Sequence, residues 1–490
     1  MRKEPMTSRA APPGRPSRSR SLLRAGDSHS MLVEAYDQDG LAVGQVHGVE
    51  VHVPGAVASE EVTVRIDHVS RHKPVVWATL VSVERPAAAR VAPRCPMAGR
   101  CGGCPWMHIE YEEQLAAKRA RIEPVAAGLG QAASAVVVDA SPSLFRYRNR
   151  GKYVPARRGR KLILGAYEPR SHRVIETLGC LAVEPAVDQT VRALVDVLSG
   201  VPIRLYNEQT RKGDLRYVGI RANHRGQVLA TMVLAEEPSW DLKEAVDRFS
   251  GACPELVGVT VDVNRTEGNV IFSGAASALV GQAWIEERFG SVAVRLSGHG
   301  FAQVNREQAT RLYEHVADRA ARPLGTRQVE RVWELFSGPG ALSMTMAHRG
   351  LSVLGIERDA QSVQSARRAA EAQGLSCRFI EADANQALVK GIVDEPAPDV
   401  VVLNPPRSGC RPELLLGIGR ARIGRVIYVS CNPTTLARDL IVLADFGYFL
   451  TDLQGFDLMP HTPHVETVAV MSHRSAFRRS EPGASRGLGA

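Results

Sequence analysis

The chain has 490 residues, of which 44% are hydrophobic and 23% are charged, as in an ordinary globular protein of two to four domains. No apolar run approaches the roughly 20 residues that span a bilayer, no secretory apolar core begins the chain, and eight cysteines are too few for a disulfide scaffold. We therefore expect a protein of the reducing cytoplasm that has no membrane partner. Most of its net charge of +9 lies at the two ends.

The chain divides into segments of different composition. Residues 1–30 and 474–490, rich in Arg, Ser, Pro and Gly, are predicted to be disordered tails. Short alternating stretches between turn residues predict a small OB-like β-barrel over 31–88. Residues 89–325 indicate a mixed α+β central domain that begins with a cysteine-rich loop. Residues 326–473 alternate strands and helices, which predicts a parallel sheet buried on both faces. The expected fold is multidomain α/β.

A basic segment lies near the start of the central domain. Residues 145–173 carry ten Arg or Lys side chains against Glu168 alone, with four aromatic residues among them. Cations for phosphates and rings for unstacked bases are what looped RNA requires. A solvated basic hairpin without a ligand remains the alternative interpretation.

The first strands of the C-terminal segment end in glycines and acids. ELFSGPG, residues 334–340, falls where a strand turns into a helix and lets the backbone approach a ligand. A third glycine at dinucleotide spacing and a Walker lysine are both missing, which disfavours NAD and ATP. Glu357 and Asp383 end the next two strands and favour S-adenosylmethionine (SAM), although incidental acidic loop residues would look the same.

The next two strand ends carry Asn404-Pro-Pro and Cys431-Asn-Pro, and we expect both to face one crevice. A helix start after Cys431 is predicted to lower the pKa of the thiol and make it a nucleophile. The alternative interpretation is that Cys431 is a small buried hydrophobic residue without a chemical role. Glu466 follows His461 and His464 in a loop. Because a third metal ligand is not evident, we interpret this glutamate as a general base.

Four cysteines outside the C-terminal segment have the composition of a metal site. They are Cys95, Cys101, Cys104 and Cys180. Four thiolates suit either zinc or an iron–sulfur cluster, and the spacing does not separate the two. A redox pair is disfavoured because no thioredoxin-like βαβ unit surrounds them.

Several of these motifs, in this order, resemble the SAM-dependent RNA (uracil-5-)-methyltransferases that carry a TRAM domain and an iron–sulfur cluster. The resemblance runs from about residue 31 to 472. It includes RCPMAGRCGGCPWMHIEYEEQLAAKRARI, FRYRNRGKY, RSHRVIETLGC, FAQVN, ELFSGPG, LNPPRSG, SCNP and PHTPHVE.

This resemblance implies an N-terminal TRAM barrel, a central domain with an iron–sulfur loop and a C-terminal Rossmann-like class I methyltransferase domain. It implies a [4Fe-4S] cluster on the four cysteines, Cys431 as the nucleophile and Glu466 as the general base. The implied SAM contacts are Gln303, Phe336, Glu357, Asp383 and Asn404. The implied substrate is a uridine in structured RNA, with 23S ribosomal RNA favoured and transfer RNA possible. We expect a monomer without an obligate protein partner.

Two positions depart from the family pattern. Asn404 stands where the family has Asp, and Ala341 where it usually has Asn. These departures motivate one alternative, an RNA-binding protein of the same fold with weakened or lost catalysis. Cytosine carbon-5 methylation and a zinc-stabilised RNA adaptor are two further alternatives. An active uridine enzyme is favoured, because neither departure touches Cys431 or Glu466.

Overall fold

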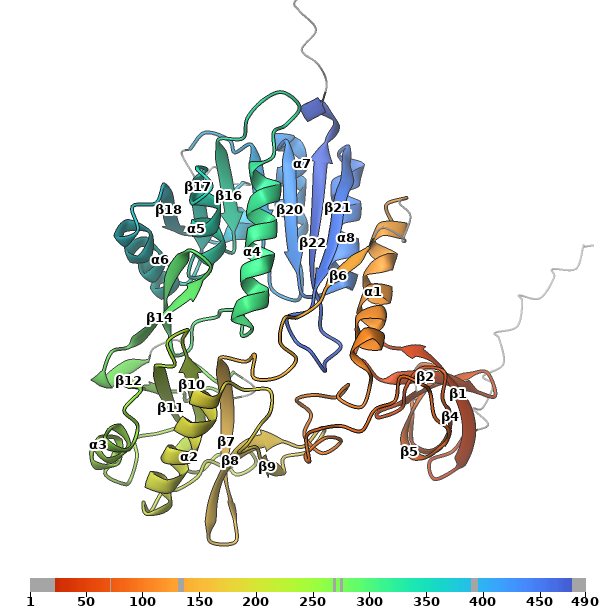
Figure 1. The fold of residues 1–490 in the computed structure, drawn as a ribbon, viewed down its shortest axis with the longest axis vertical. Helices are drawn as coiled ribbons and strands as arrows, with labels where there is room; N and C mark the ends of the chain where they lie inside the picture. Colours follow the sequence, from red (N-terminus) through yellow and green to blue (C-terminus); the bar gives the residue numbers. More distant parts are fainter. Residues whose placement is uncertain are drawn as a thin grey trace, which may run out of the picture. The chain divides into compact units, whose positions relative to one another are not determined.

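The computed structural model describes most of the chain and divides it into two compact units, residues 1–90 and 91–490 (Figure 1). The described residues are 23–70, 72–130, 136–267, 270–273, 276–388 and 395–477. Within these ranges, no helix is both long enough and apolar enough to cross a membrane.

The first unit is a closed five-stranded barrel with its own apolar core. Its strands are β1 (Ser28–Tyr36), β2 (Ala42–Val46), β3 (Val49–Val53), β4 (Glu61–Val69) and β5 (Val75–Arg85). They follow the order β1-β2-β3-β5-β4, and β4 pairs back onto β1. Alternate side chains of β4, among them Val62, Val64 and Ile66, fill the interior, as the period of two in a strand requires. The predicted OB-like barrel is confirmed.

Order extends beyond the boundaries that composition suggested. Leu23 is buried in the barrel core, the Gly26 amide donates to the Ile66 carbonyl at 2.8 Å, and β1 begins at Ser28. Disorder is therefore the wrong prediction for 23–30, because strand pairing and one apolar side chain hold this stretch. At the other end, η3 (Arg474–Phe477) is a short 3₁₀ helix. The remaining parts of both predicted tails, 1–22 and 478–490, lie outside the described residues.

The second unit contains a seven-stranded sheet with the order β13-β12-β11-β10-β7-β8-β9. Its strands are β7 (Arg150–Arg158), β8 (Lys161–Tyr167), β9 (Val174–Glu176), β10 (Leu215–Ala222), β11 (Val228–Leu234), β12 (Leu256–Val263) and β13 (Ser277–Gly281). Helices α2 (Pro185–Ser199) and α3 (Leu242–Ala252) pack together, and apolar residues of both share one core with the sheet. This is the mixed α+β region that the sequence indicated.

The structure changes the interpretation of the basic segment 145–173. Tyr147 and Tyr153 are only 5% exposed, because they pack into the unit's interior, and so they cannot stack on bases. Lys161 pairs with Glu176 at 2.7 Å. The cationic character of this segment therefore resides in its exposed arginines and Lys152, and two of its rings belong to the core.

An eight-stranded sheet, β18-β17-β16-β19-β20-β22-β21-β6, carries the C-terminal segment. Its strands are β16 (Arg331–Leu335), β17 (Ser352–Glu357), β18 (Cys377–Glu381), β19 (Val400–Leu403), β20 (Arg425–Ser430), β21 (Tyr448–Phe456), β22 (Glu466–His473) and β6 (Val137–Asp139). Strands β16 to β20 pair in parallel, as predicted, whereas β22 runs antiparallel to both β20 and β21.

Helices cover both faces of this sheet, and alternate strand residues enter two separate cores. Val400 and Val402 face one core, while Val401 and Leu403 face the other. The first core includes residues of α4 (Arg306–Ala321), α5 (Ala341–Ala347), α6 (Ala360–Ala372) and the hairpin β14 (Trp284–Phe289) and β15 (Val292–Ser297). The second includes residues of α1 (Tyr111–Ala127), α7 (Pro412–Ala421) and α8 (Pro433–Asp445).

Elements that precede residue 326 complete this layered structure. Strand β6 pairs in parallel with β21, and α1 packs on α8 and β21 (Figure 1). Helix α4 packs on α5 and β20. The sequence gives no sign of these long-range contacts, because a three-residue strand has no periodicity that could assign it to a sheet.

Candidate functional site

One cavity of about 570 Å³ lies at the carboxyl ends of the parallel strands. It is lined by all seven residues that were predicted to hold the cofactor or carry the chemistry. These are Gln303, Phe336, Glu357, Asp383, Asn404, Cys431 and Glu466. Five of them lie within two residues of the carboxyl end of a parallel strand, Glu466 begins β22, and Gln303 comes from the segment before α4. The crevice expected from the strand-end rule is therefore present.

The glycine loop between β16 and α5 takes a conformation that lets the backbone approach a ligand. Gly338 and Gly340 have φ values of 53° and 81°, in the left-handed region. A side chain at Gly340 would also meet the Phe379 ring at 2.5 Å. The Gly338 amide donates to the Glu357 carboxylate at 3.0 Å, which fixes the loop against the end of β17.

The acidic residue after β18 is held ionised. Burial opposes ionisation of Asp383, but hydrogen bonds from the Asn385 backbone and side chain lower its pKa. The Asn385 amide donates to Asp383 at 3.0 Å. Asn404, directly after β19, lines the same cavity without a charge. Two carboxylates, Glu357 and Asp383, and one amide, Asn404, therefore surround the space above the glycine loop.

Cys431 follows β20 and precedes the first turn of α8, where the Asn432 side chain accepts from the Thr434 amide at 3.1 Å. The prediction that this position lowers the thiol pKa is wrong. Burial and the nearby Glu466 charge raise the pKa of Cys431, although Arg407 opposes them through its charge and a hydrogen bond. Desolvation and a carboxylate outweigh the helix start, so the thiolate depends on Arg407 for stabilisation.

Glu466 is the first residue of β22 and lines the cavity beside Cys431. Burial raises the pKa of Glu466 to about 7, although a hydrogen bond with Gln303 and the charge of Arg407 oppose this rise. A pKa near the operating pH suits a general base. His464 is less suited to this role, because burial and the nearby Arg407 lower its pKa to about 4.

Arg407 is the functional side chain that the sequence analysis left without a role. It lies in the LNPPRSG motif, lines the cavity and approaches the His464 ring at 3.4 Å. It also interacts with Cys431 and with Glu466. An arginine three residues after the Asn404 strand end was the available signal, since other functional residues cluster at such ends.

A second cavity, of about 390 Å³, is lined by Cys95, Cys101, Cys104 and Cys180. All eight cysteines are free. Burial and then the neighbouring Cys180 raise the pKa of Cys104 to about 12. Within the described ranges, no three His, Cys, Asp or Glu side chains are grouped closely enough for a metal ion. The four thiols thus share one cavity without closing around a single point.

Comparisons with known proteins identify relatives of this chain. The model of the tRNA (uracil-5-)-methyltransferase family matches residues 279–474. An uncharacterized RNA methyltransferase of Geobacter sulfurreducens is 32% identical over 94% of this chain and 95% of the relative. One from Thermosynechococcus vestitus is 33% identical over 92% and 99%. The crystal structure of the Pyrococcus abyssi tRNA (uracil-54, C5)-methyltransferase with S-adenosyl-L-homocysteine superposes with a TM-score of 0.73, at 25% identity over 90% of this chain and 100% of that one.

Proposed function

This chain belongs to the SAM-dependent RNA (uracil-5-)-methyltransferase family, and from that premise we propose that it methylates carbon 5 of a uridine in structured RNA through a covalent adduct on Cys431. The observation that carries the proposal is the single cavity that holds a thiol, a carboxylate with a pKa of about 7 and the strand-end acids.

The strand-end residues fit SAM. Glu357 and Asp383 offer acceptors for ribose hydroxyls, and the backbone at Gly338 allows close approach of a ligand. Gln303 and Phe336 line the same space. When bound there, SAM supplies an electrophilic methyl group, and the protein has to make carbon 5 of the uracil nucleophilic.

Cys431 creates that nucleophile. Carbon 5 of uracil does not react with a sulfonium directly, but addition of the Cys431 thiolate at carbon 6 forms a carbon–sulfur bond and makes carbon 5 enolate-like. The Arg407 guanidinium stabilises the thiolate before it adds. The target base must leave its stack to reach the cavity.

Glu466 completes the reaction. After carbon 5 has taken the methyl group, the Glu466 carboxylate removes the proton that remains on that carbon. The electron pair of the broken C–H bond restores the carbon 5–carbon 6 double bond and expels Cys431 as a thiolate. One nucleophile and one base therefore suffice for turnover.

The four cysteines fit a [4Fe-4S] cluster. Their thiols line one cavity, which brings four potential thiolate ligands to the same place in the fold. Cys95, Cys101, Cys104 and Cys180 would hold the cluster, whose iron–thiolate bonds would tie the 95–104 loop to the turn after β9. Free thiols also suit a reducing cytoplasm.

The class of RNA substrate is proposed from the domain arrangement and from a relative. The OB-like barrel together with the cysteine loop favours 23S ribosomal RNA, whereas the Pyrococcus abyssi relative acts on transfer RNA. A second candidate function is RNA binding with lapsed catalysis, motivated by Asn404 in the cavity and by Ala341 at the start of α5.

Replacement of the nucleophile tests the proposed function. Cys431→Ala should abolish methyl transfer from labelled SAM, while RNA retention on filters stays within about twofold of wild type, because the thiol contributes little binding area. Cys253→Ala is the matched control, since Cys253 is buried outside the cavity. Full methyl transfer by Cys431→Ala would overturn the mechanism.

A further inference from the structure

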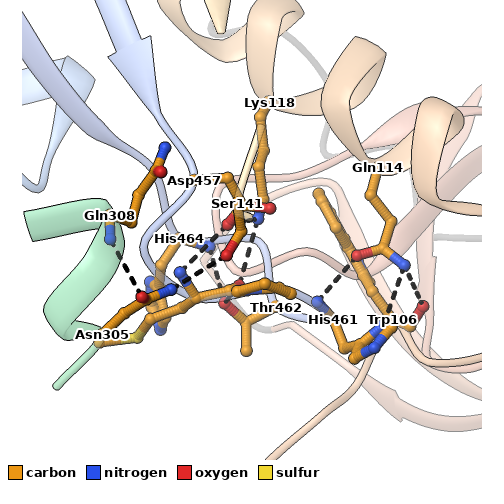
Figure 2. Close-up of polar contacts among 12 residues, drawn as sticks. Trp106, Gln114, Lys118, Ser141, Asn305, Gln308, Asp457, His461, Thr462 and His464 are labelled. Atoms are coloured by element: carbon orange, nitrogen blue, oxygen red, sulfur yellow. Dashed lines mark hydrogen bonds and ion pairs between the residues drawn. The ribbon is translucent and has the colours of Figure 1, made fainter. Parts of the chain in front are cut away.

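The loop that leads into Glu466 is held by a buried ion pair with α1. Loop 457–465 connects β21 to β22, and its first residue, Asp457, accepts from the Lys118 ammonium at 2.6 Å. Both side chains are 0% exposed. Lys118 also donates to the Met459 carbonyl at 3.2 Å, so that one cation fixes two points of the loop (Figure 2).

Gln114, one helical turn before Lys118, fixes the middle of the same loop. Its side-chain oxygen accepts from the His461 amide at 2.8 Å, and its nitrogen donates to the Trp106 and Ile109 carbonyls at 3.2 and 2.8 Å. The Trp106 amide donates in turn to the His461 carbonyl at 2.9 Å. Figure 2 shows Gln114 between Trp106 and His461. The loop is thereby joined to the segment that directly follows Cys104.

These contacts matter because of where the loop ends. Glu466 comes five residues after His461 and begins β22, where it pairs with Phe456 of β21. Between His461 and Glu466, the His464 amide donates to Thr462 at 3.3 Å and the His464 ring lies 3.4 Å from the Arg407 side chain. A displacement of about 1 Å in a reacting group can lower a rate about 100-fold. The course of the loop that leads to the base therefore depends on anchors more than 300 residues away in the chain, beside the pairing of β22 with β21.

We propose that Gln114 and Lys118 are positioning residues for Glu466. They hold loop 457–465 so that the carboxylate reaches the carbon-5 proton of the methylated adduct. This inference rests on the proposed function, and it assigns to α1 a role in the last chemical step. Neither residue lines the cavity of Cys431 and Glu466.

A positioning role and a purely structural role of Gln114 and Lys118 predict different amounts of the covalent RNA–protein adduct. If the base is displaced while the cavity stays intact, Cys431 still adds to the uridine and methyl transfer still occurs. Only removal of the carbon-5 proton is slowed, so the methylated RNA–protein adduct accumulates. A folding defect would instead lower adduct formation and turnover together.

Gln114→Met is the test variant, because it keeps the side-chain length and removes the four hydrogen bonds of the amide, which include one to the His461 ring at 3.2 Å. The substrates are in vitro transcripts of transfer RNA and of 23S ribosomal RNA domains, with methyl-labelled SAM. We expect kcat to fall about 10- to 100-fold, with KM for SAM within about twofold of wild type. Labelled adduct that survives denaturation should accumulate, as it should in Glu466→Gln, and should vanish when Cys431→Ala is added.

Gln373→Met is the matched control. Gln373 makes the same kind of contacts, accepting from the Ala293 amide at 2.8 Å and donating to the Ala293 and Ala369 carbonyls at 2.8 and 2.7 Å, but it joins β15 to α6. This variant should turn over without accumulating adduct.

A second variant guards against simple unfolding. Lys118→Met combined with Asp457→Asn removes both charges of the buried pair, so no unpaired ion is left, and it should also accumulate labelled adduct. Turnover of Gln114→Met equal to that of Gln373→Met, or parallel loss of adduct and turnover in both test variants, would overturn the inference. Failure of the proposed function looks different, because wild-type protein and Glu466→Gln would then form no adduct at all.

Discussion

The ionisation of Glu466 sets the pH dependence of the final step. Because burial raises its pKa to about 7, the carboxylate gains its base form as the pH rises through that value. The rate of product release from a preformed adduct should therefore increase from pH 6 to pH 8 and then level off. Single-turnover chase experiments measure this step apart from Cys431 addition. A flat profile across this range in wild type would contradict the assignment.

Asn404 is one of the two cavity-lining residues, with Ala341, that we interpret from the sequence as departures from the family pattern. An aspartate there would add a negative charge to a cavity that receives a cationic ligand, and a charge-assisted hydrogen bond is worth about 1.5–3 kcal/mol. Asn404→Asp should thus tighten SAM binding about 10- to 150-fold in calorimetry. Unchanged or weaker binding would show that the amide is not a handicap.

Single residues also show what a sequence can and cannot predict. The position of Cys431 followed from a strand end and that of Glu466 from a loop before the last apolar run, both of which are local patterns. The direction in which the pKa of Cys431 shifts could not be predicted in this way, because it depends on burial and on a carboxylate that is 35 residues away in the chain. The role of Arg407 was missed for the same reason, since its partners meet only in the folded cavity.

At the scale of elements, the cysteine loop and the turn after β9 together supply the four thiols of the proposed cluster site. Cys180→Ser should lower the iron content and the visible absorbance of anaerobically purified protein, because one of four cavity thiols is removed. Cys253→Ser provides the control, as this buried thiol lies beside Thr190 at 3.7 Å and outside the cavity. Full iron content in Cys180→Ser would remove that residue from the ligand set.

Helix α1 contributes to stability as well as to positioning. Lys118→Met leaves the Asp457 carboxylate buried without its cation, and removal of one partner of a buried pair lowers the free energy of unfolding by about 3–5 kcal/mol. Urea denaturation should show this loss, and Lys118→Met with Asp457→Asn should recover part of it. Equal stability of wild type and Lys118→Met would contradict a buried, ionised pair.

Among the elements, the five parallel strands were predictable because continuous apolar runs are typical of a doubly covered sheet. The barrel was predictable from alternation and turn residues. The pairing of β6 with β21 and the packing of α1 on that strand were not, because neither leaves a local pattern.

At the scale of the whole molecule, chain segments from both faces of the eight-stranded sheet contribute to one site. Gln303 precedes α4, Cys431 follows β20, and the loop before Glu466 is fastened by α1. Burial of Tyr147 and Tyr153 leaves the basic segment with its exposed cations and two half-buried rings, Phe145 and Tyr167, so RNA contact there is expected to be mainly electrostatic and weakened by salt. Filter binding at increasing salt concentration would measure this, and salt-independent retention would contradict it.

The most direct test of the account is tritium release from RNA labelled at uridine carbon 5. Anaerobically purified protein would be given SAM and either 23S ribosomal RNA or transfer RNA lacking 5-methyluridine. The account predicts release that requires both SAM and Cys431 and that occurs from the RNA class containing the target. No release from either pool, with RNA still bound, would contradict it and identify an RNA-binding protein whose catalysis has lapsed.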